Sequence, residues 1–234
     1  MLRFLTWNLA MLERSAGAPP HWDSSATEAA VRQIVLDLEP DVVLYQELPG
    51  LVPFVETHAM VPANPTSHSG NLATLISNEL ASTTVEVTTV DGAAVLSTFV
   101  ELGLTIANVH LVPGKGASAD RLMQLSQVIE ASATLPLVIA GDTNMRLAEA
   151  DALLDLGFSG DKPAHPTWDS RRNRFRTDMA EFTAYFTRWF ASPGVKVTDV
   201  KVHYQPVEHD DYRFHISDHY ALSGVISVAP DATS

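Results

Sequence analysis

The chain has 234 residues, of which 28 are acidic and 15 basic, so its formal net charge is −13. Because 46% of the residues are hydrophobic and only 18% are charged, the composition excludes a disordered chain. A chain of this length can bury roughly 70% of its unfolded surface and corresponds to between one and two average domains. We expect a single domain over residues 1–230 and a C-terminal tail at 231–234.

Charge and cysteine content narrow the function further. The absence of cysteine excludes disulfides, thiolate zinc sites and a cysteine nucleophile. The acidic balance disfavours sequence-independent coating of nucleic acid, although it permits binding of one phosphate group at a metal. The first ten residues are too polar for a signal peptide, and no apolar run approaches the ~20 residues of a membrane span. We therefore expect a cytoplasmic protein without a membrane span, and nothing in the sequence indicates an obligate protein partner.

The first predicted elements are a strand, a helix and a second strand. Leu2–Trp7 predicts a short strand. The S-x-x-E pattern from Ser25 to Glu28 is typical of a capping box and predicts a helix that ends before Pro40. Asp41–Glu47 is a nearly continuous apolar run, as expected of a buried strand.

The rest of the chain is predicted to contain more strands than helices. Residues rich in Val, Ile and Thr, or alternating apolar and polar, predict strands at Thr83–Val90, Ala93–Val100, Thr105–Leu111, Leu137–Ala140, Val195–Tyr204 and Tyr220–Val228. Helical spacing predicts helices at Ser118–Ala131 and Leu147–Leu156. This succession favours an α/β (α+β) fold in which two sheets pack face to face with helices outside.

Polar side chains stand where the apolar strands end. They are Asn8, Glu47, His110, Asp142, Asn144, Asp218 and His219. Taken singly, each is more often a turn, cap or hydrogen-bonded core residue than a functional one. If the strand ends converge, however, three carboxylates and two carboxamides meet at one edge of the two sheets. Burying each carboxylate costs several kcal/mol unless a cation is present. Hard oxygen ligands favour Mg²⁺, with Mn²⁺ as the alternative.

The order of these motifs resembles the endonuclease/exonuclease/phosphatase superfamily over nearly the whole chain, from Thr6 to Leu222. The matching motifs are Trp7-Asn8, Gln46-Glu47, Asn108-Val-His110, Gly141-Asp-Thr-Asn144 and Ser217-Asp-His219. Within it, Ala140–Arg146 and Thr167–Asp169 are most similar to the 5′-tyrosyl-DNA phosphodiesterase 2 family. The resemblance implies a four-layer α/β/β/α sandwich with two mixed sheets.

The resemblance also implies a division of roles around a phosphoester. The metal would be held by Glu47 with help from Asn8 and Asp218. Four residues would be catalytic: Asp142 would orient and deprotonate water, Asn144 would donate to the phosphoryl oxygens, and His110 and His219 would stabilise charge on phosphorus. Arg146 would contact a phosphate and Trp168 would provide a stacking surface.

One departure from the family pattern concerns the group that orients the catalytic histidine. Thr187 stands where the family has an aspartate. A hydroxyl can accept from an imidazole N–H but adds no charge, so we expect a moderated rate and a shifted pH profile. Asp178 and Asp210 are the alternative sources of a carboxylate.

Three further clusters leave alternatives open. Arg171, Arg172, Arg174 and Arg176 would form a basic rim that binds phosphates, or simply a solvated loop. The group His203, His209, His215, Glu208, Asp210 and Asp211 fits no standard metal spacing and favours a polar loop over a second metal site. A third set favours core packing over base stacking and consists of Phe182, Tyr185, Phe186, Trp189 and Phe190.

The sequence thus predicts a Mg²⁺-dependent phosphodiesterase that activates water for in-line attack on a phosphoester, with DNA ends as the first substrate hypothesis. A small-molecule or lipid phosphoester is the alternative substrate. A non-catalytic binding module on the same fold is the third hypothesis, disfavoured because such a module has no physical need to keep costly polar groups together.

Overall fold

The computed structural model describes residues 1–234 except 51–55, 66–69, 133–134, 161, 178–179 and 230–234, and no side chains of 62–65. The first sheet contains, in spatial order, β12 (Val195–His203), β15 (Ala221–Val228), β1 (Leu2–Asn8), β2 (Val42–Leu48), β4 (Asn71–Ser77) and β3 (His58–Pro65). The second contains β11 (Thr187–Ala191), β8 (Leu137–Asp142), β7 (Leu104–His110), β6 (Ala94–Phe99) and β5 (Val85–Val90).

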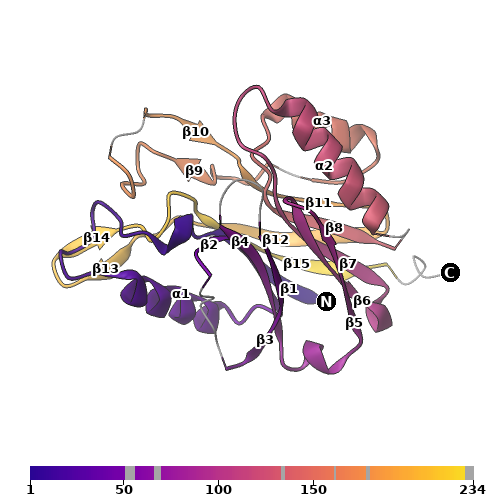
Figure 1. The fold of residues 1–234 in the computed structure, drawn as a ribbon, viewed down its shortest axis with the longest axis horizontal. Helices are drawn as coiled ribbons and strands as arrows, with labels where there is room; N and C mark the ends of the chain where they lie inside the picture. The colour runs from indigo at the N-terminus through magenta and orange to yellow at the C-terminus, as the bar shows by residue number, and fades with distance from the viewer. Residues whose placement is uncertain (51–55, 66–69, 133–134, 161, 178–179, 230–234) are drawn as a thin grey trace.

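Each sheet has one parallel pair at its centre, and the neighbouring strands run antiparallel (Figure 1). β1 pairs in parallel with β2, and β7 pairs in parallel with β8. A parallel pair brings two carboxyl ends to the same edge, and the registers set Asn8 opposite Gln46 and His110 opposite Asp142. β1 also pairs antiparallel with β15, so the two ends of the described chain meet in one sheet.

Helices cover the outer face of each sheet and complete the predicted four-layer sandwich (Figure 1). α1 (Ser24–Leu38) packs Val31 and Val35 on the first sheet. The second sheet is covered by α2 (Ser118–Ala131) and α3 (Leu147–Asp155), which pack Leu125 and Leu153 on it. This confirms the α/β fold class and its two packed mixed sheets.

The strands are apolar on both faces because both faces are buried. In β1, Phe4 packs into the core between the sheets, whereas Leu5 packs towards α1. The inter-sheet core also receives Leu44 and Ile106 from the two parallel pairs. Strands buried in this way read as continuous apolar runs, which is why they were predictable.

Short elements complete the fold. They are the hairpin of β9 (Trp168–Asp169) and β10 (Thr183–Ala184), the hairpin of β13 (Val207–His209) and β14 (Tyr212–Phe214), and 3₁₀ turns at Ala10–Leu12, Leu80–Ser82 and Val100–Leu102. No helix in the described ranges is both long and apolar enough to span a membrane.

The capping-box prediction at Ser25 was wrong. Helix α1 begins at Ser24, and its N-cap is Asp23, whose side chain accepts from the backbone N–H of Ala26 at 2.9 Å. Ser25 therefore lies inside the helix, because the aspartate two residues earlier satisfies the free N–H of the first turn. The helix ends at Leu38, before Pro40, as predicted.

Candidate functional site

The candidate site lies at the edge where the carboxyl ends of both parallel pairs meet. Asn8 ends β1 in one sheet and Asp142 ends β8 in the other, and both side chains are almost fully buried. The Nδ2 of Asn8 donates to Oδ2 of Asp142 at 2.9 Å. Residues 134 positions apart thus form a hydrogen bond that joins the two sheets at the site.

Two imidazoles flank Asp142. The Nε2 atoms of His110 and His219 lie 3.6 and 3.5 Å from Oδ2 of Asp142, and the backbone N–H of Asn144 donates to Oδ1 at 3.0 Å. Burial alone would raise the pKa of Asp142, but the two imidazoles and the donors from Asn8 and Asn144 outweigh it, so this pKa lies below its ordinary value. The carboxylate is therefore ionised near neutral pH and is available as a proton acceptor.

Glu47 provides a second carboxylate near the same ring nitrogen of His110. Its Oε1 lies 3.6 Å from Nε2 of His110, and its side chain is 22% exposed. Burial lowers the pKa of His110, and the nearby carboxylates of Asp142 and Glu47 oppose this without reversing it. His110 therefore brings no permanent positive charge to the two carboxylates.

This arrangement fits a divalent cation. The ligand atoms of Glu47, His110 and Asp142 all lie within 4.8 Å of one another. Among the ion pairs of the described residues, these two carboxylates face only histidines and no Lys or Arg. Two converging carboxylates without a permanent counter-charge match the oxygen-rich chemistry that Mg²⁺ and Mn²⁺ prefer.

Asp218 lies next to the cluster but makes a different contact. Its Oδ2 is 3.4 Å from Nε of Arg176, and its side chain is 15% exposed. Ser217 anchors this segment, since its Oγ donates to the carbonyl of Asn8 at 2.6 Å and accepts from the N–H of His219. The metal-binding role of Asp218 remains a prediction.

Asn144 lies two residues after the end of β8, in a left-handed conformation with a φ of 49°. Its Nδ2 donates to the carbonyl of Leu111 at 3.0 Å. This hydrogen bond connects the segment after β8 to Leu111, which directly follows β7. The predicted donation by Asn144 to a phosphoryl oxygen would require a second N–H of the same amide.

Thr187 lies beside His219, in the place that the sequence pattern indicates. Its Oγ1 is 3.2 Å from Nδ1 of His219, and both side chains are buried. Asp210, one of the alternative carboxylates, pairs instead with His209 on the β13–β14 hairpin. The other alternative, Asp178, lies outside the described residues.

The residues expected to bind substrate divide into buried and exposed ones. Trp168 is only 7% exposed, and its ring meets that of His219 edge-on, with centroids 4.9 Å apart. Phe182 stacks on Trp168 at 5.7 Å and is 36% exposed, so its assignment to the core was wrong. The guanidinium of Arg146 lies 4.8 Å above the ring of Phe186. The aromatic surface open to a ligand is thus that of Phe182 rather than of Trp168.

Part of the arginine cluster lines a cavity of about 360 Å³. Arg172 and Arg174 line it, together with Arg213, which sequence reasoning did not select. Tyr220 and Asp169 also line it, and these residues directly follow His219 and Trp168 in sequence. Arg213 lies alone between aromatic residues in the sequence, so no local pattern marked it.

Of the cavity arginines, Arg172 pairs with Asp169 at 3.8 Å and Arg213 pairs with Glu208 at 3.7 Å. Arg171 is exposed and is not among the residues that line the cavity. Arg176 forms ion pairs with Glu13 and Asp218. Of the four arginines in the sequence cluster, only Arg172 and Arg174 therefore line the cavity.

The histidines weighed as a second metal site do not gather in one place. His203 bonds to Ser223 Oγ at 2.8 Å, and His215 bonds to the carbonyl of Tyr204 at 3.2 Å. Burial lowers the pKa of both imidazoles. Within that group, His209 pairs with Asp210, whereas Glu208 pairs with Arg213.

Comparison with known proteins agrees with this architecture. The model of the Endonuclease/Exonuclease/phosphatase family matches residues 5–219. No curated protein sequence gives a significant match.

Several solved structures share the fold. Truncated TDP2 from Caenorhabditis elegans superposes with a TM-score of 0.73 at 18% identity, covering 97% of this chain and 98% of that one. TDP2 from D. rerio, complexed with a single-strand DNA product, superposes with a TM-score of 0.72 at 22% identity, covering 97% of this chain and 99% of that one. The catalytic domain of human Nocturnin, with a bound sulfate anion, superposes with a TM-score of 0.64 at 17% identity, covering 97% of this chain and 93% of that one.

Proposed function

Because this chain belongs to the endonuclease/exonuclease/phosphatase family, we propose that it is a divalent-metal-dependent phosphodiesterase that acts at DNA ends. Endonucleases, exonucleases and phosphatases all hydrolyse phosphoester bonds. The observation that carries the proposal is the convergence of Glu47, His110 and His219 around the buried carboxylate of Asp142. The TDP2 of D. rerio was solved with a single-strand DNA product, and the likeness to its fold supports the choice of a DNA substrate.

The side chains of the cluster have the properties that water attack on a phosphoester requires. Asp142, ionised and held by Asn8, orients the attacking water and accepts its proton. His110 and His219 both lie close to Oδ2 of Asp142. Their N–H groups would donate hydrogen bonds to the phosphoryl oxygens and so stabilise the negative charge that builds there. Thr187 holds His219 through its Nδ1 atom.

Glu47, Asn8 and Asp218 would hold the cation. When bound, Mg²⁺ or Mn²⁺ would polarise the phosphoryl oxygen and stabilise the leaving oxygen. Asn8 is compatible with this role because its Oδ1 accepts only from the N–H of Ala10 and keeps a second lone pair.

A DNA end is supported by two further features of the structure. The arginine-lined cavity offers positive charge for phosphates next to the scissile one, in a chain whose net charge is −13. Phe182 offers an exposed ring on which a terminal base could stack.

The test is a panel of phosphoesters with Mg²⁺, Mn²⁺ or EDTA, comprising bis-p-nitrophenyl phosphate, a 5′-tyrosyl oligonucleotide, single- and double-stranded DNA, RNA and sugar phosphates. We expect metal-dependent turnover that is highest on the DNA ends. Asp142→Asn should lower kcat on every substrate by about 10³-fold or more, because it removes the proton acceptor. The exposed Asp155→Asn is the matched control and should retain full activity.

The outcomes separate the hypotheses. Full activity in Asp142→Asn would remove the assigned base. Turnover of sugar phosphates alone would favour the small-molecule alternative, and no turnover of any substrate in the presence of metal would favour the non-catalytic module.

A further inference from the structure

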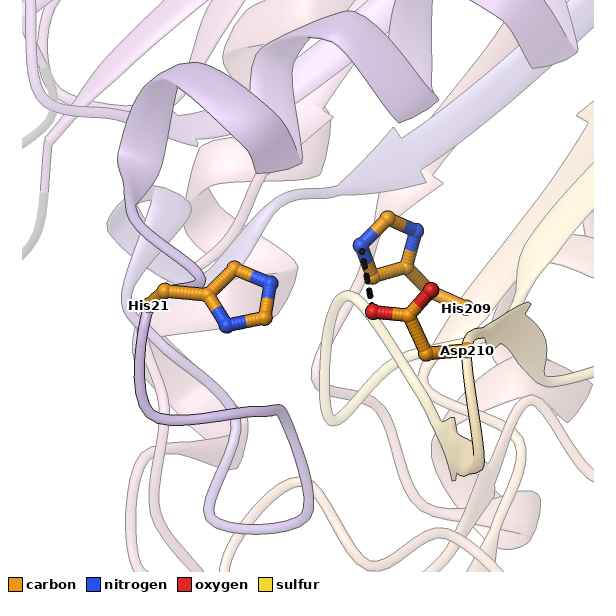
Figure 2. Close-up of side chains that lie close together, drawn as sticks. All are labelled: His21, His209 and Asp210. Atoms are coloured by element: carbon orange, nitrogen blue, oxygen red, sulfur yellow. Dashed lines mark ion pairs between the residues drawn. The ribbon is translucent and has the colours of Figure 1, made fainter.

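A second group of metal-ligating side chains lies away from the strand-end cluster. His21 belongs to the loop before α1, whereas His209 and Asp210 belong to the β13–β14 hairpin (Figure 2). Their ligand atoms all lie within 4.8 Å of one another, and Nε2 of His209 is 3.7 Å from Oδ2 of Asp210. Within the described ranges, only this group and the strand-end cluster bring three such residues so close.

The three side chains are exposed, but a small core fixes the backbone beneath them. Trp22, next to His21, is 7% exposed and packs edge-on against Phe214 of β14 with ring centroids 4.7 Å apart. The same indole meets the ring of His209 at 5.2 Å, and its Nε1 donates to Thr27 at 2.8 Å. This packing joins the loop to the hairpin. It holds the ring centroids of His21 and His209 5.8 Å apart.

The chemistry of the group differs from that of the strand-end cluster. It offers two imidazole nitrogens and one carboxylate, a set that suits Zn²⁺, Ni²⁺ or Cu²⁺ better than Mg²⁺. Bonds of about 2.0–2.2 Å in a tetrahedral site place neighbouring ligand atoms roughly 3.4 Å apart. Exposed side chains can close the remaining gap by changing rotamer, and water can occupy the fourth position.

We propose that His21, His209 and Asp210 form a binding site for a transition-metal dication such as Zn²⁺. The bound ion would join the loop that precedes α1 to the hairpin that leads into Ser217-Asp218-His219. Binding would stabilise the folded chain, because the unfolded chain does not hold His21 near His209.

The site is tested with Zn²⁺ alone as the probe, by calorimetric titration and thermal unfolding with excess Mg²⁺ present to saturate the strand-end cluster. We expect one Zn²⁺ per chain and a rise in Tm that increases with zinc concentration. His21→Ala and His209→Ala should each weaken Zn²⁺ binding by about tenfold or more, since each removes one of three ligands. The exposed His165→Ala is the matched control and should bind as the wild type does.

A second readout uses Co²⁺, whose visible absorption reports its coordination geometry. Four-coordinate bands in the wild type that disappear in His21→Ala would support the site. Zinc affinity unchanged in both histidine variants would overturn the proposal, and so would binding that is lost only in Glu47→Gln. His21→Ala and His209→Ala leave the residues of the strand-end cluster intact, so basal turnover with Mg²⁺ should be unchanged in these two variants.

Discussion

At the residue scale, the contact between Thr187 and His219 defines how this chain departs from its family pattern. The hydroxyl lies 3.2 Å from Nδ1 of His219 and brings no charge to the pair. It can fix the orientation of the imidazole, but it cannot stabilise the protonated form as a carboxylate would. The chemistry of the site should therefore be sensitive to this one position.

Thr187→Asp should change the pH dependence of catalysis. A carboxylate at this distance would stabilise the protonated form of His219. The alkaline limb of the plot of kcat against pH should therefore shift to higher pH by about 1 pH unit or more. Thr187→Ser, which keeps the hydroxyl, should leave the profile unchanged, and circular dichroism checks that both variants fold. An unchanged profile in the aspartate variant would show that Thr187 does not act through His219.

At the scale of the element, β8 needs glycine one residue before Asp142. Gly141 has a φ of +149°, and a Cβ built there would lie 2.1 Å from the carbonyl oxygen of Val109 on the neighbouring strand. Because this neighbour is backbone, it cannot move aside as the end of a flexible side chain could. The close approach of β7 and β8 sets the spacing between His110 and Asp142.

Gly141→Ala should therefore destabilise the fold by about 2 kcal/mol or more, because it combines a backbone overlap with an unfavourable φ. Urea unfolding measures the change. Gly116→Ala is the matched control, since no atom lies within 4 Å of its added Cβ, and its stability should change by less than about 1 kcal/mol. Equal stability of both variants would contradict the argument.

Helices α2 and α3 are joined by a buried ion pair. Arg121 is fully buried and forms hydrogen bonds of 2.7 and 2.8 Å to the carboxylate of Glu149, and its other donors reach the carbonyls of Val112 and Gly114. Burial raises the pKa of Glu149, but the hydrogen bond and charge of Arg121 outweigh it, so the pKa is lowered. The pair thus stabilises the fold above the ordinary pKa of Glu149 and loses this contribution as the pH falls through the lowered value.

Glu149→Gln should cost about 3 kcal/mol at neutral pH, because it leaves a buried guanidinium without its counter-charge. The difference from the wild type should shrink in acid, where Glu149 itself becomes protonated. Urea titrations at several pH values measure this trend, with the exposed Glu86→Gln as control. A difference that does not depend on pH would show that the charge of Glu149 is not responsible.

The elements that could be predicted from sequence are those with two buried faces or a helical repeat. The bounds of α2 match the prediction, and those of β1 and β2 differ by one residue at their ends. Strand β3 was missed because it lies at the sheet edge, where proline is tolerated and no continuous apolar run forms. Strand β4 was missed although both of its faces are buried, so burial alone did not make a strand predictable. The two short hairpins were missed because two- and three-residue strands carry no period.

At the scale of the whole molecule, charge is distributed unevenly. The chain carries a net charge of −13, yet three arginines line one cavity. Sequence reasoning found two of the three because they are close in sequence, whereas Arg213 joins them only through the fold. The same holds for Asn8 and Asp142, whose convergence rests on the order of motifs and not on any local pattern.

Salt should separate the substrate classes. If a DNA end binds through several phosphates, its KM should rise steeply with salt concentration, because each contact releases about one counterion. The KM for bis-p-nitrophenyl phosphate should change little, since this substrate has a single phosphate. Arg172→Gln with Arg174→Gln should flatten the DNA dependence, whereas Arg32→Gln on α1 should not. An identical salt slope for both substrates would argue against DNA.

The pairing of β1 with β15 has a consequence for synthesis of the chain. β1 is translated before β15, so it finds this neighbour only after the intervening chain has been made, since Leu2 pairs with Ile226. Until then the nascent chain carries an open strand edge that can associate with other chains. The strand-end cluster likewise forms only after His219 has been translated, because this residue belongs to the cluster and lies far from Asn8 in sequence.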